Sequence, residues 1–149
     1  MDSLRFVLGK LFTDMSNMFL GASSFNQSLS GWNVSNVLNM SSMFNAATSF
    51  DQNIGNWNVS GVTNMFNMFC GAILFNNGES SSISGWNVSN VIDMQAMFNV
   101  ATSFNQNIGN WNVSGVTDME YMLDGCGVNT NNYNSTLIGW SSQSENYLS

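Results

Sequence analysis

The sequence predicts an α/β repeat fold, a right-handed solenoid of about five units with short parallel strands and short helices. Two observations lead to this fold class. Five tryptophans follow one another at spacings of 25, 29, 25 and 29 residues, and a Met-x-x-Met-Phe block recurs between them. A unit of this size cannot bury its own apolar face, so neighbouring units must stack into a continuous core.

Each tryptophan lies in a pattern that is typical of a short strand. In Ile54-x-x-Trp57-x-Val59 the two apolar residues stand two apart, and a third lies three residues earlier. Such alternation places Trp and Val on one face of a strand. The pattern also has the form of the L-x-x-L-x-L core of a leucine-rich repeat. We therefore expect parallel strands centred on Asn33, Asn58, Asn87 and Asn112.

The methionine block that follows has the pattern of a helix start. An Asn or Asp stands directly before apolar residues at i, i+3, i+4 and i+7, as in Met40, Met43, Phe44 and Ala47. A short acceptor side chain at this position is typical of an N-cap. We expect a helical turn after each of Asp14, Asn39, Asn64, Asp93 and Asp118.

The chain is expected to form a single domain over residues 1–149. Residues 1–12 form an N-terminal cap or truncated repeat, residues 13–122 form the repeats, and residues 123–149 form a last strand and a C-terminal cap. Leu137 and Trp140 keep the spacing of Leu29 and Trp32, which predicts that last strand.

One of the longer repeat spacings comes from four residues inserted within residues 76–82. Loops tolerate such insertions at small cost in free energy. We expect this segment to bulge outward and to leave the register of the repeats unchanged.

The repeated unit Trp-Asn-Val-Ser-x-Val-x-x-Met-x-x-Met-Phe-x-x-Ala-x-x-Phe-Asn-Gln resembles the BspA-like leucine-rich repeat surface proteins of bacteria and some protists. The ending Asn132-Tyr133, followed by Leu137-Ile138-Gly139-Trp140-Ser141, is similar to the closing segment of many of them. The resemblance covers about residues 13 to 142. It implies a cell-surface or extracellular domain used in adhesion or protein binding, without catalytic residues.

Composition and charge exclude several function classes. The chain has two basic and nine acidic residues, giving a formal charge of −7, and only 7% of its residues are charged. Nucleic-acid binding needs clustered Lys and Arg, which this chain lacks. No apolar run is long enough to span a membrane. Met1 to Lys10 has no basic stretch before an uninterrupted apolar segment and does not form a secretory signal.

No catalytic centre is predicted, because the chain has no histidine and its carboxylates are scattered. No cofactor site and no metal site are predicted. Calcium is the alternative, since Asp93, Asp118, Glu120 and Asp124 crowd the later units and carboxylates are ligands of this cation. The Asp-x-Asp-x-Asp-Gly calcium loop is absent, and N-capping explains Asp93 and Asp118 as well as Asn39 and Asn64.

The remaining candidate site is the outward face of the expected strands, which carries uncharged rows of Asn and Ser. Solenoids usually bind partners on such a face. Its residues are Asn33, Ser35, Asn56, Asn58, Ser60, Asn87, Ser89, Asn110, Asn112 and Ser114. Gly31 and Gly85 take the position of Asn56 and Asn110 in the other two units.

Three functions fit this face. The first is interaction or adhesion, with a protein or a glycan as partner. The second is a structural role as a subunit of a larger surface or viral-particle assembly, with a homo-oligomer as one form of it. The third is ice binding by regular Asn and Ser rows, which the scarcity of Thr on this face disfavours. The first places the protein at the cell surface or outside the cell, and the second in a particle.

Overall fold

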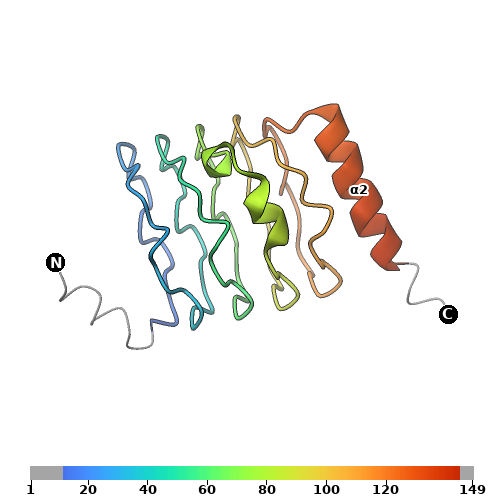
Figure 1. Ribbon diagram of the computed structural model, residues 1–149, viewed down its shortest axis with the longest axis horizontal. Helices are drawn as coiled ribbons and strands as arrows, with labels where there is room; N and C mark the ends of the chain where they lie inside the picture. The colour runs from blue at the N-terminus through green and yellow to red at the C-terminus, as the bar shows by residue number, and fades with distance from the viewer. Residues whose placement is uncertain (1–11, 145–149) are drawn as a thin grey trace.

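The computed structural model describes residues 12–144, which form a stack of loop-built layers that follow one another in chain order (Figure 1). Within these residues the one α-helix is α2 (Thr130–Ser144), which lies beyond the last loop layer. Two short 3₁₀-helices, η1 (Asn77–Glu79) and η2 (Ser81–Gly85), occupy the inserted segment. Parallel pairing is limited to isolated bridges that join Asp14, Asn39, Asn64, Asp93 and Asp118 in sequence.

The predicted fold class is therefore wrong. No strand is formed at Asn33, Asn58, Asn87 or Asn112, no helix follows the Asn and Asp positions, and no sheet exists in the described range. The protein is not a leucine-rich-repeat-like α/β solenoid with parallel strands. The predicted last strand is also wrong, because Leu137 and Trp140 lie in α2.

Five Met segments, residues 14–22, 39–47, 64–72, 93–101 and 118–126, form one side of the layers. Inside each segment successive turns close hydrogen bonds between residues three apart, such as Met43 N–H to Met40 O. Two residues per segment have positive φ, for example Ser42 (54°) and Ala46 (56°). A left-handed residue breaks the run of right-handed dihedrals that an α-helix requires. The Met segment is therefore a run of turns.

The same geometry turns alternate N–H groups toward the next layer. Each of the first four Met segments donates four backbone hydrogen bonds to the segment that follows it. In the second layer Met40, Ser42, Phe44 and Ala46 donate to Asn64, Phe66, Met68 and Cys70, at 2.7–2.9 Å. The bonds of the other three junctions run in the same direction. Pairing of backbone groups between layers thus replaces pairing within a helix.

The predicted N-cap residues perform a related task. The Oδ1 atoms of Asp14, Asn39, Asn64, Asp93 and Asp118 each accept the backbone N–H two residues later, at 2.8–3.0 Å. This contact is an Asx-turn, which uses the same acceptor chemistry as an N-cap. The chemistry was predicted correctly, but it begins a turn and not a helix.

Four Trp segments, residues 25–34, 50–59, 75–88 and 104–113, form the other side of the layers. Their alternation of burial is as expected: Trp57 and Val59 are buried and Asn58 is exposed. Their backbone N–H groups close turns, such as Trp57 N–H to Ile54 O, so they form no strand ladder. Instead the indole N–H of Trp57 donates to Leu29 O of the preceding layer, at 3.1 Å.

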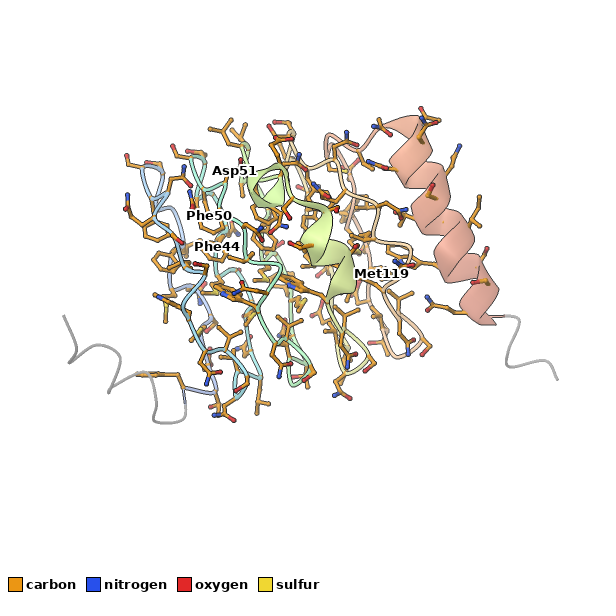
Figure 2. The ribbon with its side chains drawn as sticks, in the orientation of Figure 1. Phe44, Phe50, Asp51 and Met119 are labelled. Atoms are coloured by element: carbon orange, nitrogen blue, oxygen red, sulfur yellow. The ribbon has the colours of Figure 1, made fainter. Side chains whose placement is uncertain are left out.

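The core consists of columns of like side chains. The residues of these columns in the inner layers are almost fully buried, such as Met43, Phe44, Ala47 and Ile54. The ring centroids of Phe44, Phe69 and Phe98 follow one another at 5.5 Å with ring planes within 4°. The ring centroid of Phe50 lies 4.0 Å from that of Phe44 in the same layer. Both residues are labelled in Figure 2. Such offset stacking adds to the stabilisation from apolar burial.

The inserted segment leaves the register unchanged, since Asn64 still pairs with Asp93 across it. The segment is nevertheless packed into the stack and is not a free bulge. Asn77 is fully buried, its Oδ1 accepts the N–H of Ile54, and its amide donates to Ser80 O. Asp51, labelled in Figure 2, accepts the N–H of Gly78 at 2.8 Å.

Candidate functional site

The predicted Asn and Ser rows form one exposed surface, which we call the Asn face. Every Asn residue of the predicted rows is exposed, and so are Gly31 and Gly85. The Ser residues are exposed or half-buried. The Asn face therefore consists of Asn33, Ser35, Asn56, Asn58, Ser60, Asn87, Ser89, Asn110, Asn112 and Ser114.

The local sequence explains why these side chains point outward. In each unit the central Asn stands between Trp and Val, and in the inner layers both are buried, as with Trp86 (3% exposed) and Val88 (1%). The apolar neighbours occupy the core, so the Asn between them faces solvent. The Asn face is thus fixed by the burial of its sequence neighbours.

Each central Asn is held by the Ser two residues later. The Oδ1 of Asn58 accepts both the backbone N–H and the hydroxyl of Ser60, at 3.2 and 2.7 Å. The same pair of contacts recurs at Asn33, Asn87 and Asn112. The rotamer of each Asn is therefore fixed before any partner arrives, which lowers the entropy cost of binding. Sequence reasoning predicted these residues but not this contact.

The central Asn residues keep their side-chain amides available for a partner. The Oδ1 atoms of the central Asn residues are engaged, whereas within residues 12–144 their Nδ2 amides make no hydrogen bond to protein. The row of Asn33, Asn58, Asn87 and Asn112 thus presents amide donors, one per layer. Asn56, two residues before the central Asn58, is different, because its Nδ2 donates to Ser30 O at 2.8 Å.

An open recess interrupts the regular rows. It is lined by Ser30, Asn53, Gly55, Asn56 and Ser82, all without charge. Ser82 belongs to η2, so one wall of the recess comes from the inserted segment. A Cβ on Gly55 would collide with the Ser82 side chain, and the close approach of the two layers there requires glycine.

A second polar column has a structural role. The Oδ1 atoms of Asn26, Asp51, Asn76 and Asn105 each accept the backbone N–H of the equivalent residue in the next layer, at 2.8–2.9 Å. Gln106 adds an amide contact back to Asn76 at 2.8 Å. The repeated Phe-Asn-Gln step in the sequence signals this column, which joins layers.

The carboxylates considered for calcium are not assembled into a site. In the part of the chain that the structure describes, no three His, Cys, Asp or Glu side chains are placed to hold a metal ion together. Asp93 and Asp118 are bridged neighbours, but each uses Oδ1 in its own Asx-turn. Glu120 accepts a hydrogen bond from Gln95 and raises the pKa of Tyr121 by hydrogen bonding and by its charge.

No helix among residues 12–144 is long and apolar enough to cross a membrane, which agrees with the prediction of no membrane span. The fold and the Asn face together define a repeat-stack protein with a regular, uncharged exposed surface.

The family model described as a Mycoplasma protein of unknown function, DUF285, matches residues 9–82 and again residues 79–148. The two matches cover most of the chain, so the chain belongs to this family. No curated protein and no solved structure matches the chain.

Proposed function

We propose that this protein is a non-enzymatic, surface-presented module for interaction or adhesion, and that its partner, a glycan or a protein, binds the Asn face. The observation that carries the proposal is the row of amide donors at Asn33, Asn58, Asn87 and Asn112, which are fixed by Ser and are exposed. Such a row fits a partner that offers repeated hydrogen-bond acceptors.

The chemistry of the face favours binding over catalysis. None of its ten residues titrates near neutral pH, and the chain contains no histidine. The uncharged recess beside Asn56 has room for a polar ring or side chain to enter between the rows. The resemblance of the repeats to BspA-like surface proteins supports a location at the cell surface or outside the cell.

The test exchanges the donor without disturbing the turn. Asn58→Asp with Asn87→Asp keeps an oxygen for Ser60 and Ser89 but removes both outward amides. Each neutral hydrogen bond contributes about 0.5–1.5 kcal/mol, so losing two should weaken binding about tenfold. Binding is measured against immobilised glycans and surface proteins, and it should depend only weakly on salt, because no charged group takes part.

The matched control is Ser60→Ala with Ser89→Ala, which removes the hydroxyl contacts and leaves the amides in place. This variant should keep most of the affinity. If the Asp variant folds and binds as tightly as the unaltered protein, the Asn face is not the binding surface.

A further inference from the structure

We infer that the two ends of the stack are complementary and that a second copy of this chain docks on them head to tail, which extends the stack. The inference goes beyond the proposed function and does not depend on the Asn face. It rests on the direction of the backbone hydrogen bonds, on the exposure of the end layers and on charge.

The hydrogen bonds between Met segments run one way. Every junction between Met segments is made by N–H groups of the earlier segment and C=O groups of the later one, for example Met94 N–H to Asp118 O at 2.9 Å. Backbone bonds in the reverse direction involve residues beside these segments, as Leu38 N–H donates to Thr13 O at 2.7 Å. Within residues 12–144 the last Met segment therefore has donors without a following Met segment, and the first has acceptors without a preceding one. Like a strand at the edge of a sheet, each end is a template for pairing.

The unpaired groups occupy equivalent positions at the two ends. Within residues 12–144 the N–H groups of Met119, Tyr121, Leu123 and Gly125 donate to no backbone oxygen. In the same range the C=O groups of Asp14, Ser16, Met18 and Leu20 accept no backbone hydrogen bond. These are the positions that form the four bonds of every inner junction.

Both end layers already have the inner geometry. Tyr121 and Gly125 have φ of 57° and 64°, and Asn17 and Gly21 have φ of 59° and 67°, as at the equivalent positions of the inner layers. The turn bonds are retained as well, for example Met122 N–H to Met119 O. Docking therefore needs no rearrangement of the Met segments. Figure 2 shows Met119 in this last layer, toward α2.

Apolar side chains are exposed at the ends where the inner layers bury them. Met18 is 42% exposed, whereas Met43, Met68 and Met97 in the same column are fully buried. At the other end Met119 is only half-buried, although Met94 is fully buried. The outer side of α2 adds Leu137 and Ile138, at 42% and 69% exposure. A further layer would cover these side chains.

Charge agrees with the head-to-tail direction. The last Met segment carries three carboxylates, Asp118, Glu120 and Asp124, whereas the first carries only Asp14, which would meet Asp118 of the other copy as Asp93 does inside the stack. Pairing like ends would place carbonyl against carbonyl or carboxylate against carboxylate. The contact is therefore heterologous, and repeating it gives an open fibre.

The test uses the full chain and one variant for each end. Leu20→Glu places a carboxylate at the acceptor end, where it meets the acidic end of the partner. Tyr121→Asp places one at the donor end, and Asp tolerates the positive φ of this position better than Tyr. Leu20 and Tyr121 are 52% and 59% exposed, so both variants are expected to fold, which circular dichroism checks.

The matched control is Ile92→Glu, because Ile92 is also 52% exposed but lies on the side of an inner layer. Light scattering should show a mass that rises beyond the dimer with concentration for the unaltered chain and for Ile92→Glu. Each end variant alone should lose all species heavier than the monomer. Mixing the two end variants should give a dimer and nothing larger, because one intact donor end meets one intact acceptor end.

Several outcomes would overturn the inference. An unaltered chain that stays monomeric at all concentrations shows that residues outside the described range, or solvent alone, cover the ends. A closed dimer that resists both end variants shows a different interface. A mixture of folded end variants that remains monomeric excludes the heterologous contact. None of these outcomes bears on binding by the Asn face.

Discussion

Single residues hold the layers in contact through conformations that most side chains avoid. Gly21, Gly71 and Gly125 occupy the second left-handed position of their Met segments, but Ala46 and Val100 occupy the same position in other layers. A β-branched residue at positive φ is an outlier, because its side chain collides with the backbone there. The inner hydrogen bonds of the layer must therefore compensate for strain at Val100.

The strain at Val100 predicts a stabilising substitution. Val100→Gly should stabilise the protein by about 0.5–1 kcal/mol, because relief of roughly 1–2 kcal/mol of strain exceeds the entropy cost of glycine. Little apolar burial is lost, since Val100 is 47% exposed. Urea unfolding followed by tryptophan fluorescence measures the difference.

The converse change at the same column is Gly71→Val, which should destabilise by about 1–2 kcal/mol. A Cβ on Gly71 would have its nearest neighbour, the Cα of Ala46, at 3.8 Å, so the loss reports strain and not crowding. If both substitutions destabilise equally, the left-handed positions do not control stability.

At the scale of the element, burial patterns were predictable but backbone conformations were not. Met40, Met43, Phe44 and Ala47 are buried together, as a helix would place them, yet they lie on a run of turns. Trp57 and Val59 are buried as in a strand, yet no strand forms. Turns with periodic left-handed residues produce the same burial pattern, so periodicity alone cannot distinguish them.

The sequence contains a signal for the true conformation. Gly and Asn are the residues that adopt positive φ most readily, and they occur at Asn17, Gly21, Asn67 and Gly71, four residues apart within each segment. Ser42, Ala46 and Val100 at the same positions hide this signal in the other layers. Asparagine and glycine have low helix propensity, so their presence at both positions of a segment argues against a two-turn helix there.

Trp140 continues the tryptophan spacing of the repeats, although it lies in α2 and not in the predicted strand. The indole N–H of Trp140 donates to Ile108 O at 3.1 Å, which is the contact that Trp57, Trp86 and Trp111 make to their preceding layers. Thr136 of the same helix accepts the N–H of Ile108 at 3.2 Å. The helix thus caps the Trp segments by offering side chains to the same backbone groups.

The tryptophan column predicts unequal losses along the stack. Trp57→Ala should cost about 3–5 kcal/mol, because Trp57 is 4% exposed and has neighbouring layers on both sides. Trp140→Ala should cost less, since Trp140 is half-buried in the terminal helix. Denaturant unfolding of both variants provides the measurement.

The control for this comparison separates burial from hydrogen bonding. Trp57→Phe keeps most of the apolar area but removes the indole hydrogen bond to Leu29 O, which still accepts the N–H of Trp32, so the cost should be about 0.5–1.5 kcal/mol. Equal losses for the Ala variants at Trp57 and Trp140 would contradict a stack of layers.

At the scale of the whole molecule, the stack has a direction. Alternate N–H groups of the Met segments point from the first layer to the last, so the dipoles of these peptide groups add along the stack as they do along a helix. The Asn face runs along the side of the same stack and stays free when copies join end to end. An extended fibre would multiply the amide row and thereby increase the avidity of weak individual contacts.

The candidate site was predictable to a limited extent. Exposure of Asn58 and its equivalents followed from the buried neighbours on either side, which the alternation in the sequence indicated. The direction of the stack was not predictable, because it depends on which N–H groups the left-handed residues turn outward. That property belongs to the backbone conformation, which the hydrophobic pattern does not determine.

The direction of the stack predicts an asymmetry between its two end layers in amide exchange. Amides of the first layer donate to the second, at 2.7–3.0 Å, whereas the equivalent amides of the last layer have no protein acceptor within residues 12–144. The first group should be protected and the second should exchange near the rate of an unfolded chain. The protected group is Met15, Asn17, Phe19 and Gly21, and the unprotected group is Met119, Tyr121, Leu123 and Gly125.

Hydrogen exchange followed by NMR in dilute solution distinguishes this directional stack from one whose ends simply fray. Fraying alone would leave both end layers equally unprotected, which would contradict the directional hydrogen bonding. Raising the protein concentration adds a second comparison, because head-to-tail docking gives the amides of Met119, Tyr121, Leu123 and Gly125 an acceptor. Their exchange should then slow for the unaltered chain and for Ile92→Glu, but not for Leu20→Glu, whose acceptor end is blocked.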